Sequence, residues 1–201
     1  MIRTLALAAV AALSLSGCAL LSSPDPIQLY RFGNPAGAST AAVASPVQVK
    51  LRSVEMPQAS QGDRLLGVTG AETSYIASAR WVSPAVMLYS DSLEASFASQ
   101  ARTVRLIGRR ELTPTTRLLD VDVHAFETRY EYAGAAPTVV ITARARLLRF
   151  PERTVVAEQT FTVSQPAGEN RVSTIVDAYD VATRDLNTQI VAWTDANATG
   201  S

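Results

Sequence analysis

Several segments of the chain alternate hydrophobic and polar residues, which is the pattern of a strand with one buried face. In one such segment, the odd positions Leu119, Val121 and Val123 are apolar, whereas the even positions are polar. The segments that alternate in this way are 27–32, 47–54, 119–125, 139–147 and 155–163. Three further segments, 63–68, 73–76 and 104–107, predict short strands or extended pieces. One apolar face per strand is typical of an antiparallel sheet with one side packed on a core.

Two other segments repeat their apolar residues every three or four positions, which predicts amphipathic helices. The first covers 84–101, with Ser83 as the predicted cap and Pro84 at the first helical position. Its apolar stripe consists of Val86, Tyr89, Leu93 and Phe97. The second helix follows Asn170, a predicted cap, and its stripe consists of Val172, Ile175, Tyr179, Ala182, Leu186, Ile190 and Trp193. These elements predict an α+β fold, a two-layer sandwich of a mainly antiparallel sheet with two amphipathic helices on one face.

The polar positions of the segment 119–125 place Asp120, Asp122 and His124 on one strand face. Alternate strand positions can supply metal ligands, so a metal site is one interpretation. The other is cross-strand charge pairing with Arg144 and Arg146, which share the polar face of the next predicted strand. An unbroken alternation allows two registers, with His124 opposite either Arg144 or Arg146. Charge pairing on a solvent-exposed face is the favoured interpretation, and no metal ligand is predicted.

The N-terminus begins with Arg3 and a mainly apolar run from Leu5 to Leu15. This run is shorter than the roughly 20 residues that a membrane-spanning helix needs, so it predicts a secretory signal peptide. The sequence Leu15-Ser16-Gly17-Cys18 resembles the lipobox of bacterial lipoproteins. This resemblance implies that the signal is cleaved before Cys18 and that Cys18 carries a diacylglyceryl group and usually a third acyl chain.

The predicted organisation has four parts: a signal peptide at 1–17, a lipidated tether at 18–26, a periplasmic domain at 27–195 and a flexible tail at 196–201. Cys18 is the only cysteine, so no disulfide within the chain is predicted. Ala19 follows it, whereas aspartate at that position would favour the inner membrane by the sorting rule of enteric bacteria. We therefore expect a lipid-anchored protein of the outer membrane that faces the periplasm.

Composition narrows the classes of function further. Hydrophobic residues make up 47% of the chain, which is enough for a core, and the formal net charge of zero gives no reason to expect nucleic-acid binding. His124 is the only histidine, and neither a nucleophile elbow nor a Walker-type phosphate loop is present. The sequence therefore predicts a protein that is not an enzyme, with no catalytic residue and no cofactor. Trp81, next to Arg80, fits either core packing or a contact surface, where aromatic and arginine side chains are favoured.

The order of these features resembles the ABC-type transport auxiliary lipoprotein family, which includes the PqiC-like outer-membrane lipoproteins. The resembling pieces are the lipobox, Leu29-Tyr30, the segment 47–54 with Pro57 behind it, Asp63-Arg64-Leu65, Tyr75-Ile76, Arg80-Trp81 before a helix, the segment 118–126, and Asp177, Ala178 and Leu186 of the last helix. Together these pieces cover nearly all of the chain that follows the signal peptide.

The resemblance implies an auxiliary component of a lipid transport system that docks the periplasmic transport subunit to the outer membrane. The implied partners are an MCE-domain periplasmic protein with its ABC permease and ATPase, the membrane through the N-terminal lipid, and further copies of the chain in a homo-oligomer. Our hypothesis for the contact surface is the segment 58–82, with Tyr75, Arg80 and Trp81. The alternative is a stand-alone envelope-assembly or structural lipoprotein that binds another outer-membrane component. A third interpretation, a metal-dependent periplasmic enzyme, depends on His124.

Overall fold

The computed structural model describes residues 26–33, 46–108 and 111–199. The predicted signal peptide, Cys18 and nearly all of the tether lie outside these residues, as do residues 34–45 between the first two predicted strands. The elements are β1 (Gln28–Tyr30), β2 (Val47–Glu55), β3 (Arg64–Thr69), β4 (Glu72–Trp81), α2 (Ala85–Gln100), β5 (Val104–Ile107), β6 (Arg117–Tyr130), β7 (Thr138–Arg149), β8 (Val155–Pro166) and α3 (Val172–Asn197).

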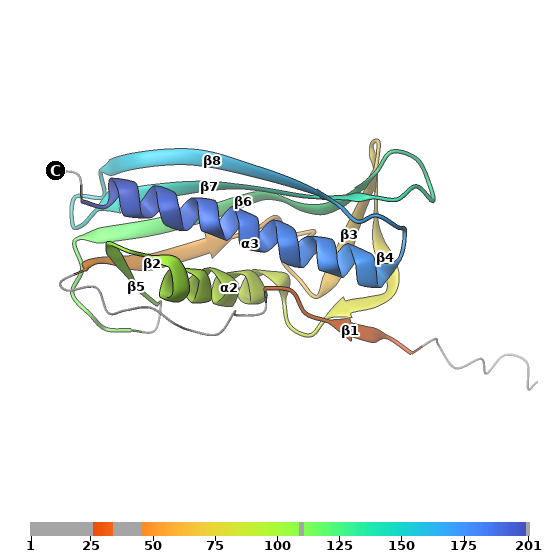
Figure 1. Cartoon of the computed structure of the whole chain (residues 1–201), viewed down its shortest axis with the longest axis horizontal. Coiled ribbons are helices and arrows are strands. Elements are labelled where there is room, and N and C mark those ends of the chain that lie inside the picture. Colours follow the sequence, from red (N-terminus) through yellow and green to blue (C-terminus); the bar gives the residue numbers. More distant parts are fainter. Residues whose placement is uncertain (1–25, 34–45, 109–110, 200–201) are drawn as a thin grey trace, which may run out of the picture.

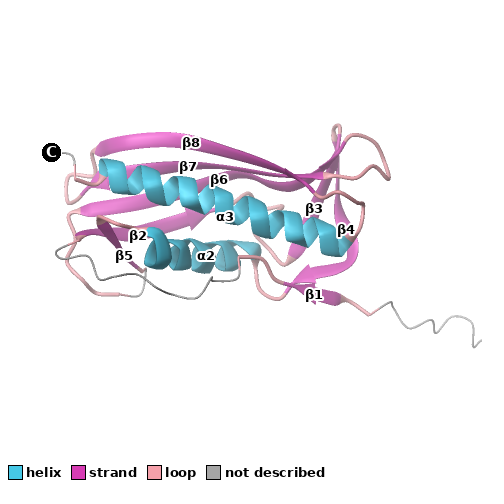
Figure 2. Cartoon of the chain, viewed as in Figure 1, coloured by secondary structure: helices cyan, strands magenta, loops and turns pink. Residues whose placement is uncertain are grey.

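The fold consists of one eight-stranded sheet with both helices packed on the same face (Figures 1 and 2). This confirms the predicted α+β class and the placement of the helices. β6 is the central strand: β7 pairs along one of its edges, and β2 and β3 share the other edge. Helix α3 packs against β7, β8 and α2, so the two helices form one layer over the sheet.

The prediction of a mainly antiparallel sheet is wrong. Within the described residues, four of the seven strand pairings are parallel: β1 with β4, β2 with β5, β2 with β6 and β3 with β6. Parallel neighbours need a crossover connection, and the chain between β2 and β5, which contains α2, provides one. Alternation shows which side chains of a strand are buried, but it does not identify the neighbouring strand.

A β-bulge at His124 interrupts the pairing of β6 with β7. Asp120 lies opposite Arg146 and Asp122 lies opposite Arg144, and the register shifts between Val123 and Ala125. Both predicted registers are therefore wrong, because Arg144 and Arg146 lie opposite the two aspartates and His124, at the bulge, has no partner in the β6–β7 register. The cross-strand charge pairing itself is confirmed, since Asp122 forms ion pairs with both arginines.

The bulge also changes which positions of β6 reach the core. Before it, the odd positions Val121 and Val123 are buried; beyond it, the even positions Phe126 and Thr128 are buried instead. Such a change of face is expected when one strand gains an extra residue. As a result, Thr128 lies beneath α3 and donates a hydrogen bond to the hydroxyl of Tyr179, at 3.2 Å.

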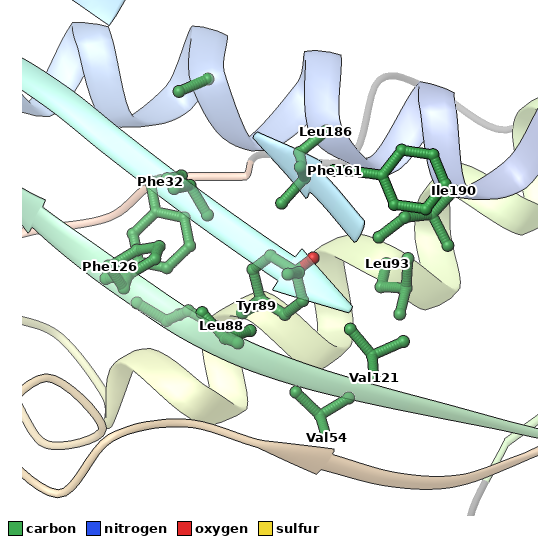
Figure 3. Close-up of a cluster of buried hydrophobic side chains, with 14 of the residues drawn as sticks. Phe32, Val54, Leu88, Tyr89, Leu93, Val121, Phe126, Phe161, Leu186 and Ile190 are labelled. Atoms are coloured by element: carbon green, nitrogen blue, oxygen red, sulfur yellow. The ribbon is translucent and has the colours of Figure 1, made fainter. Parts of the chain in front are cut away.

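The hydrophobic core lies between the sheet and the helices, with Tyr89 and Leu93 of α2 near its centre (Figure 3). Its most aromatic part joins β1, β4, β6 and α3. The ring centroids there are 4.8 Å apart for Phe32 and Trp81, and 4.8 Å apart for Phe126 and Tyr179. Aromatic pairs at such distances add to the free energy gained by burial, so this cluster fixes the end of the sheet that carries β1.

Both helices differ at their ends from the prediction. Pro84 is the N-cap of α2 and Arg171 is the N-cap of α3, and neither side chain makes a capping hydrogen bond, so the predicted caps Ser83 and Asn170 are wrong. Helix α3 continues to Asn197 and Ala198 is buried, so these residues of the predicted tail 196–201 pack on the domain.

Candidate interaction surface

The face of the sheet opposite the helices is not covered by any described helix (Figure 2). Its polar centre is built from β6, β7 and β8. Arg146 is paired with Glu158 across β7 and β8, and Arg144 is paired with Thr160. Side chains at paired positions share a face, so this part of the surface is charged and polar.

Towards β1, the same face becomes partly apolar. We call this area the β1–β4 patch and define it as Ile27, Leu29, Tyr75, Arg80 and Val82. Their exposed fractions are 54% for Ile27, 63% for Leu29, 39% for Tyr75 and 42% for Val82. These four are among eight large hydrophobic residues that are exposed in the described part of the chain. Exposed apolar side chains that gather on one surface mark a candidate interaction site.

The strand register explains why these side chains lie together. β1 runs parallel to β4, with Leu29 aligned to Arg80 and Tyr30 aligned to Trp81. Because Trp81 points into the core, Arg80 and Leu29 point to the uncovered face. The N–H of Val82 donates to the carbonyl oxygen of Tyr30, which holds the end of β4 against β1.

Charged residues of β3 border the patch. Arg80 forms an ion pair with Asp63, at 2.9 Å, and both side chains are more than a third exposed. Arg64 lies 4.0 Å above the centroid of the Tyr75 ring, a cation–π contact. Exposed pairs of this kind contribute roughly 0–1 kcal/mol to stability, so these residues are available for binding at little cost to the fold.

The structure separates the three predicted contact residues. Tyr75 and Arg80 lie at the surface of the β1–β4 patch, whereas Trp81 is only 2% exposed and packs edge-on against Phe32 and Tyr179. Trp81 is therefore a core residue, which is one of the two interpretations that the sequence allowed. Its burial fixes the position of Arg80 next to it.

Ile27, Leu29 and Val82 were not singled out from the sequence. For Ile27 and Leu29, the signal in the sequence was their position directly after the predicted tether.

A second cluster of charge occupies the polar centre of the uncovered face. Arg52 of β2 donates two hydrogen bonds to Asp120 of β6, whose side chain has no exposed surface. This hydrogen bonding raises the pKa of Arg52 above its ordinary value. Arg146 bridges to Asp122 at 2.9 Å and approaches Asp120 at 3.8 Å. The prediction that Asp120 is solvent-exposed is wrong, since Arg52 and Arg146 cover it.

A hollow of about 1030 Å³ lies between the C-terminal ends of the two helices. Its lining includes Asp195 of α3, whose carboxylate accepts hydrogen bonds from the backbone N–H groups of Arg102, Thr103 and Val104. Asp195 therefore fastens the chain between α2 and β5 to α3.

Two further properties follow from the residues that the structure describes. None of their helices is long and apolar enough to cross a membrane. No group of three or more histidine, cysteine, aspartate or glutamate side chains among them could hold a metal ion.

Comparison with known proteins identifies the family. The sequence model of the ABC-type transport auxiliary lipoprotein component matches residues 30–191. The chain therefore belongs to this family of lipoproteins, which is not a known family of enzymes. The predicted resemblance is confirmed. No curated protein sequence matches the chain.

Solved structures share the fold. Protein XCC0632 from Xanthomonas campestris is 24% identical, with a TM-score of 0.71 over 85% of this chain and 96% of that one. An uncharacterized protein is 16% identical, with a TM-score of 0.64 over 84% of this chain and 99% of that one. The hypothetical protein CT253 from Chlamydia trachomatis is 9% identical, with a TM-score of 0.55 over 78% of this chain and all of that one.

Proposed function

We propose that this protein is held in the outer membrane by a lipid on Cys18, faces the periplasm, and docks the periplasmic MCE-domain subunit of an ABC-type lipid transport system to that membrane. The observation that carries the proposal is the family match over residues 30–191, in a chain that also has the lipobox Leu15–Cys18. An auxiliary lipoprotein of a transporter works by binding, and a permease and an ATPase in the inner membrane supply the energy.

The contact with the transport subunit lies on the β1–β4 patch, through Tyr75 and Arg80. The geometry supports this placement because an aromatic ring and a guanidinium lie on one exposed surface, and such side chains dominate the binding energy of protein interfaces. Trp81 acts indirectly, since its burial against Phe32 fixes the end of β4. A variant of Trp81 would disturb the core, so Tyr75 and Arg80 are the residues to change.

The test is affinity purification of the full-length lipoprotein from gently solubilised membranes, with mass spectrometry of the proteins that co-purify. We expect an MCE-domain protein together with its permease and ATPase. Recovery of an outer-membrane assembly protein without any of these would contradict the proposal and favour the stand-alone alternative.

A pair of double variants tests the contact surface. Tyr75→Ala with Arg80→Ala should reduce recovery of the MCE-domain protein, whereas Tyr132→Ala with Arg105→Ala should not. The control pair is matched because Tyr132 is exposed in the β6–β7 turn and Arg105 forms an exposed ion pair with Glu111. Equal recovery with both pairs would exclude the β1–β4 patch as the contact surface.

A further inference from the structure

We infer that the apolar side chains of the β1–β4 patch, Ile27, Leu29 and Val82, lie against the phospholipid surface of the membrane that holds the lipid on Cys18. This inference rests on the lipid anchor of the proposed function. It adds an orientation: the domain meets the membrane with its β1 end instead of tumbling freely on its tether.

The first observation is the exposure of these side chains on one side of the sheet edge. Leu29 is aligned to Arg80, and Ile27, directly before β1, precedes Leu29 by two positions. Val82 follows Arg80 by two positions and its backbone is bonded to β1. Three aliphatic side chains, each more than 40% exposed, therefore share one surface without a described residue that covers them.

The second observation is the length of chain between the anchor and this surface. Ile27 lies nine positions after Cys18, with eight residues between them. At 3.3–3.6 Å per residue, this connection spans at most about 30 Å. The apolar surface begins where the predicted tether ends, so lipid on Cys18 keeps Ile27 within about 30 Å of the anchor. The opposite end of the sheet, where β8 begins, lies a full strand length farther away (Figure 1).

The third observation is the chemistry that borders the apolar side chains. Arg31 and Arg64 are exposed, whereas Arg80 is held in an ion pair with Asp63. Exposed arginine side chains such as Arg31 and Arg64 attract anionic headgroups. An acyl anchor combined with a second, weaker contact is the usual arrangement for stable attachment to a membrane.

The lipid contact and the protein contact use different residues of the same patch. Ile27, Leu29 and Val82 face the lipid, and Tyr75 and Arg80 of β4 face the transport subunit. The transport subunit would then bind directly beside the membrane surface, where an exit for lipid has to lie.

The test places an environment-sensitive thiol fluorophore on the lipidated full-length protein, reconstituted into vesicles of phosphatidylethanolamine and phosphatidylglycerol. The probe positions are Leu29→Cys and Val82→Cys, and the control is Val155→Cys. Val155 is a matched control because its exposed fraction of 54% lies between those of Leu29 (63%) and Val82 (42%), and it lies at the opposite end of the sheet. Because Cys18 carries lipid, the introduced cysteine is the thiol that reacts with the fluorophore.

We expect the emission at positions 29 and 82 to shift to shorter wavelength on reconstitution and to be quenched by nitroxide-labelled headgroups, with no change at position 155. If the emission at all three positions is unchanged while the protein floats with the vesicles, the membrane contact is excluded and the lipid anchor on Cys18 is retained. If the unlabelled protein does not float and Cys18 reacts with the thiol reagent, both the anchor and this inference are overturned. If positions 29 and 82 leave water only when the transport subunit is added, the surface is a protein interface and the inference is wrong.

Discussion

Arg52 of β2 and Asp120 of β6 form an ion pair in which the aspartate is fully buried and the arginine is 42% exposed. Arg52 occupies a position where the pairing of β2 with β6 shifts by one residue. This irregularity lets the Arg52 side chain reach across to Asp120, with Nε 2.6 Å from the carboxylate oxygen. The pair therefore joins two parallel strands that are distant in sequence.

Replacing Asp120 by alanine should destabilise the protein, because it leaves the charges of Arg52 and Arg146 without the carboxylate between them. Since Arg52 is partly solvated, we expect a loss of about 2–3 kcal/mol in the free energy of unfolding, below the full cost of breaking a buried pair. Chemical denaturation of the purified variant measures this. Glu111→Ala is the control, since its ion pair with Arg105 is exposed on both sides and should cost less than about 1 kcal/mol. Equal losses would show that the burial of Asp120 does not matter.

Gly33→Ala should be strongly destabilising. Gly33 has φ +66°, and a Cβ added there would lie 2.5 Å from the Cβ of Ser92 in α2. Its N–H also donates to Asp180 of α3, at 2.8 Å, so the backbone cannot easily move away. Gly70→Ala is the control, because Gly70 has a similar φ of +58° but open space around it. Thermal unfolding should show a larger loss for Gly33→Ala than the roughly 1 kcal/mol of backbone strain expected at Gly70. Equal losses would mean that the contact with Ser92 relaxes.

The two buried tyrosines should respond differently to loss of the hydroxyl. Tyr179→Phe leaves Thr128 Oγ1 without its bond to the Tyr179 hydroxyl, which should cost about 1–2 kcal/mol of unfolding free energy. The Tyr89 hydroxyl is buried without a hydrogen-bond partner among the described residues, so Tyr89→Phe should be neutral or stabilising. Denaturant midpoints of the two variants measure the difference. A larger loss for Tyr89→Phe would contradict this account.

The same two tyrosines predict how stability depends on alkaline pH. Burial raises the pKa of Tyr89 and of Tyr179 above the ordinary value of 10.0. The unfolded chain therefore loses these protons at lower pH than the folded protein does. The two neutral hydroxyls make their full contribution to the free energy of unfolding below pH 10, and this contribution is lost as the pH rises above 10. Ultraviolet absorbance should show two of the six tyrosines ionising only as the fold is lost. Ionisation of all six before unfolding would contradict the prediction.

Deletion of His124 should leave both faces of β6 unchanged. His124 is the extra residue of the bulge, so its removal places Phe126 two positions after Val123 and keeps Phe126 and Thr128 toward the core. His124→Ala keeps the bulge and removes only an exposed side chain, so we expect a change within about 0.5 kcal/mol. Circular dichroism and binding of a hydrophobic dye compare the two variants, and we expect a folded protein from both. Dye binding by the deletion variant alone would show that the fold needs the bulge itself.

The sequence by itself determined the elements and the family. Period-two alternation located the long strands, since one face of each packs on a core, and the three-to-four spacing located both helices. The motifs from Leu29 to Leu186 were sufficient for the family, which the match over residues 30–191 confirms. The lipobox and the lipid on Cys18 remain predictions from local sequence.

Only the tertiary structure decided how the elements are joined and which side chains are accessible. The parallel pairings and the bulge at His124 depend on contacts between distant segments, which a local pattern does not contain. The same holds for burial. Trp81 is covered by Phe32 and by Tyr179 of α3, and Asp120 is covered by arginines of other strands. Leu29 is exposed because β1 is an edge strand with no helix over that side. Alternation gives each strand two faces, and tertiary packing decides which of them water reaches.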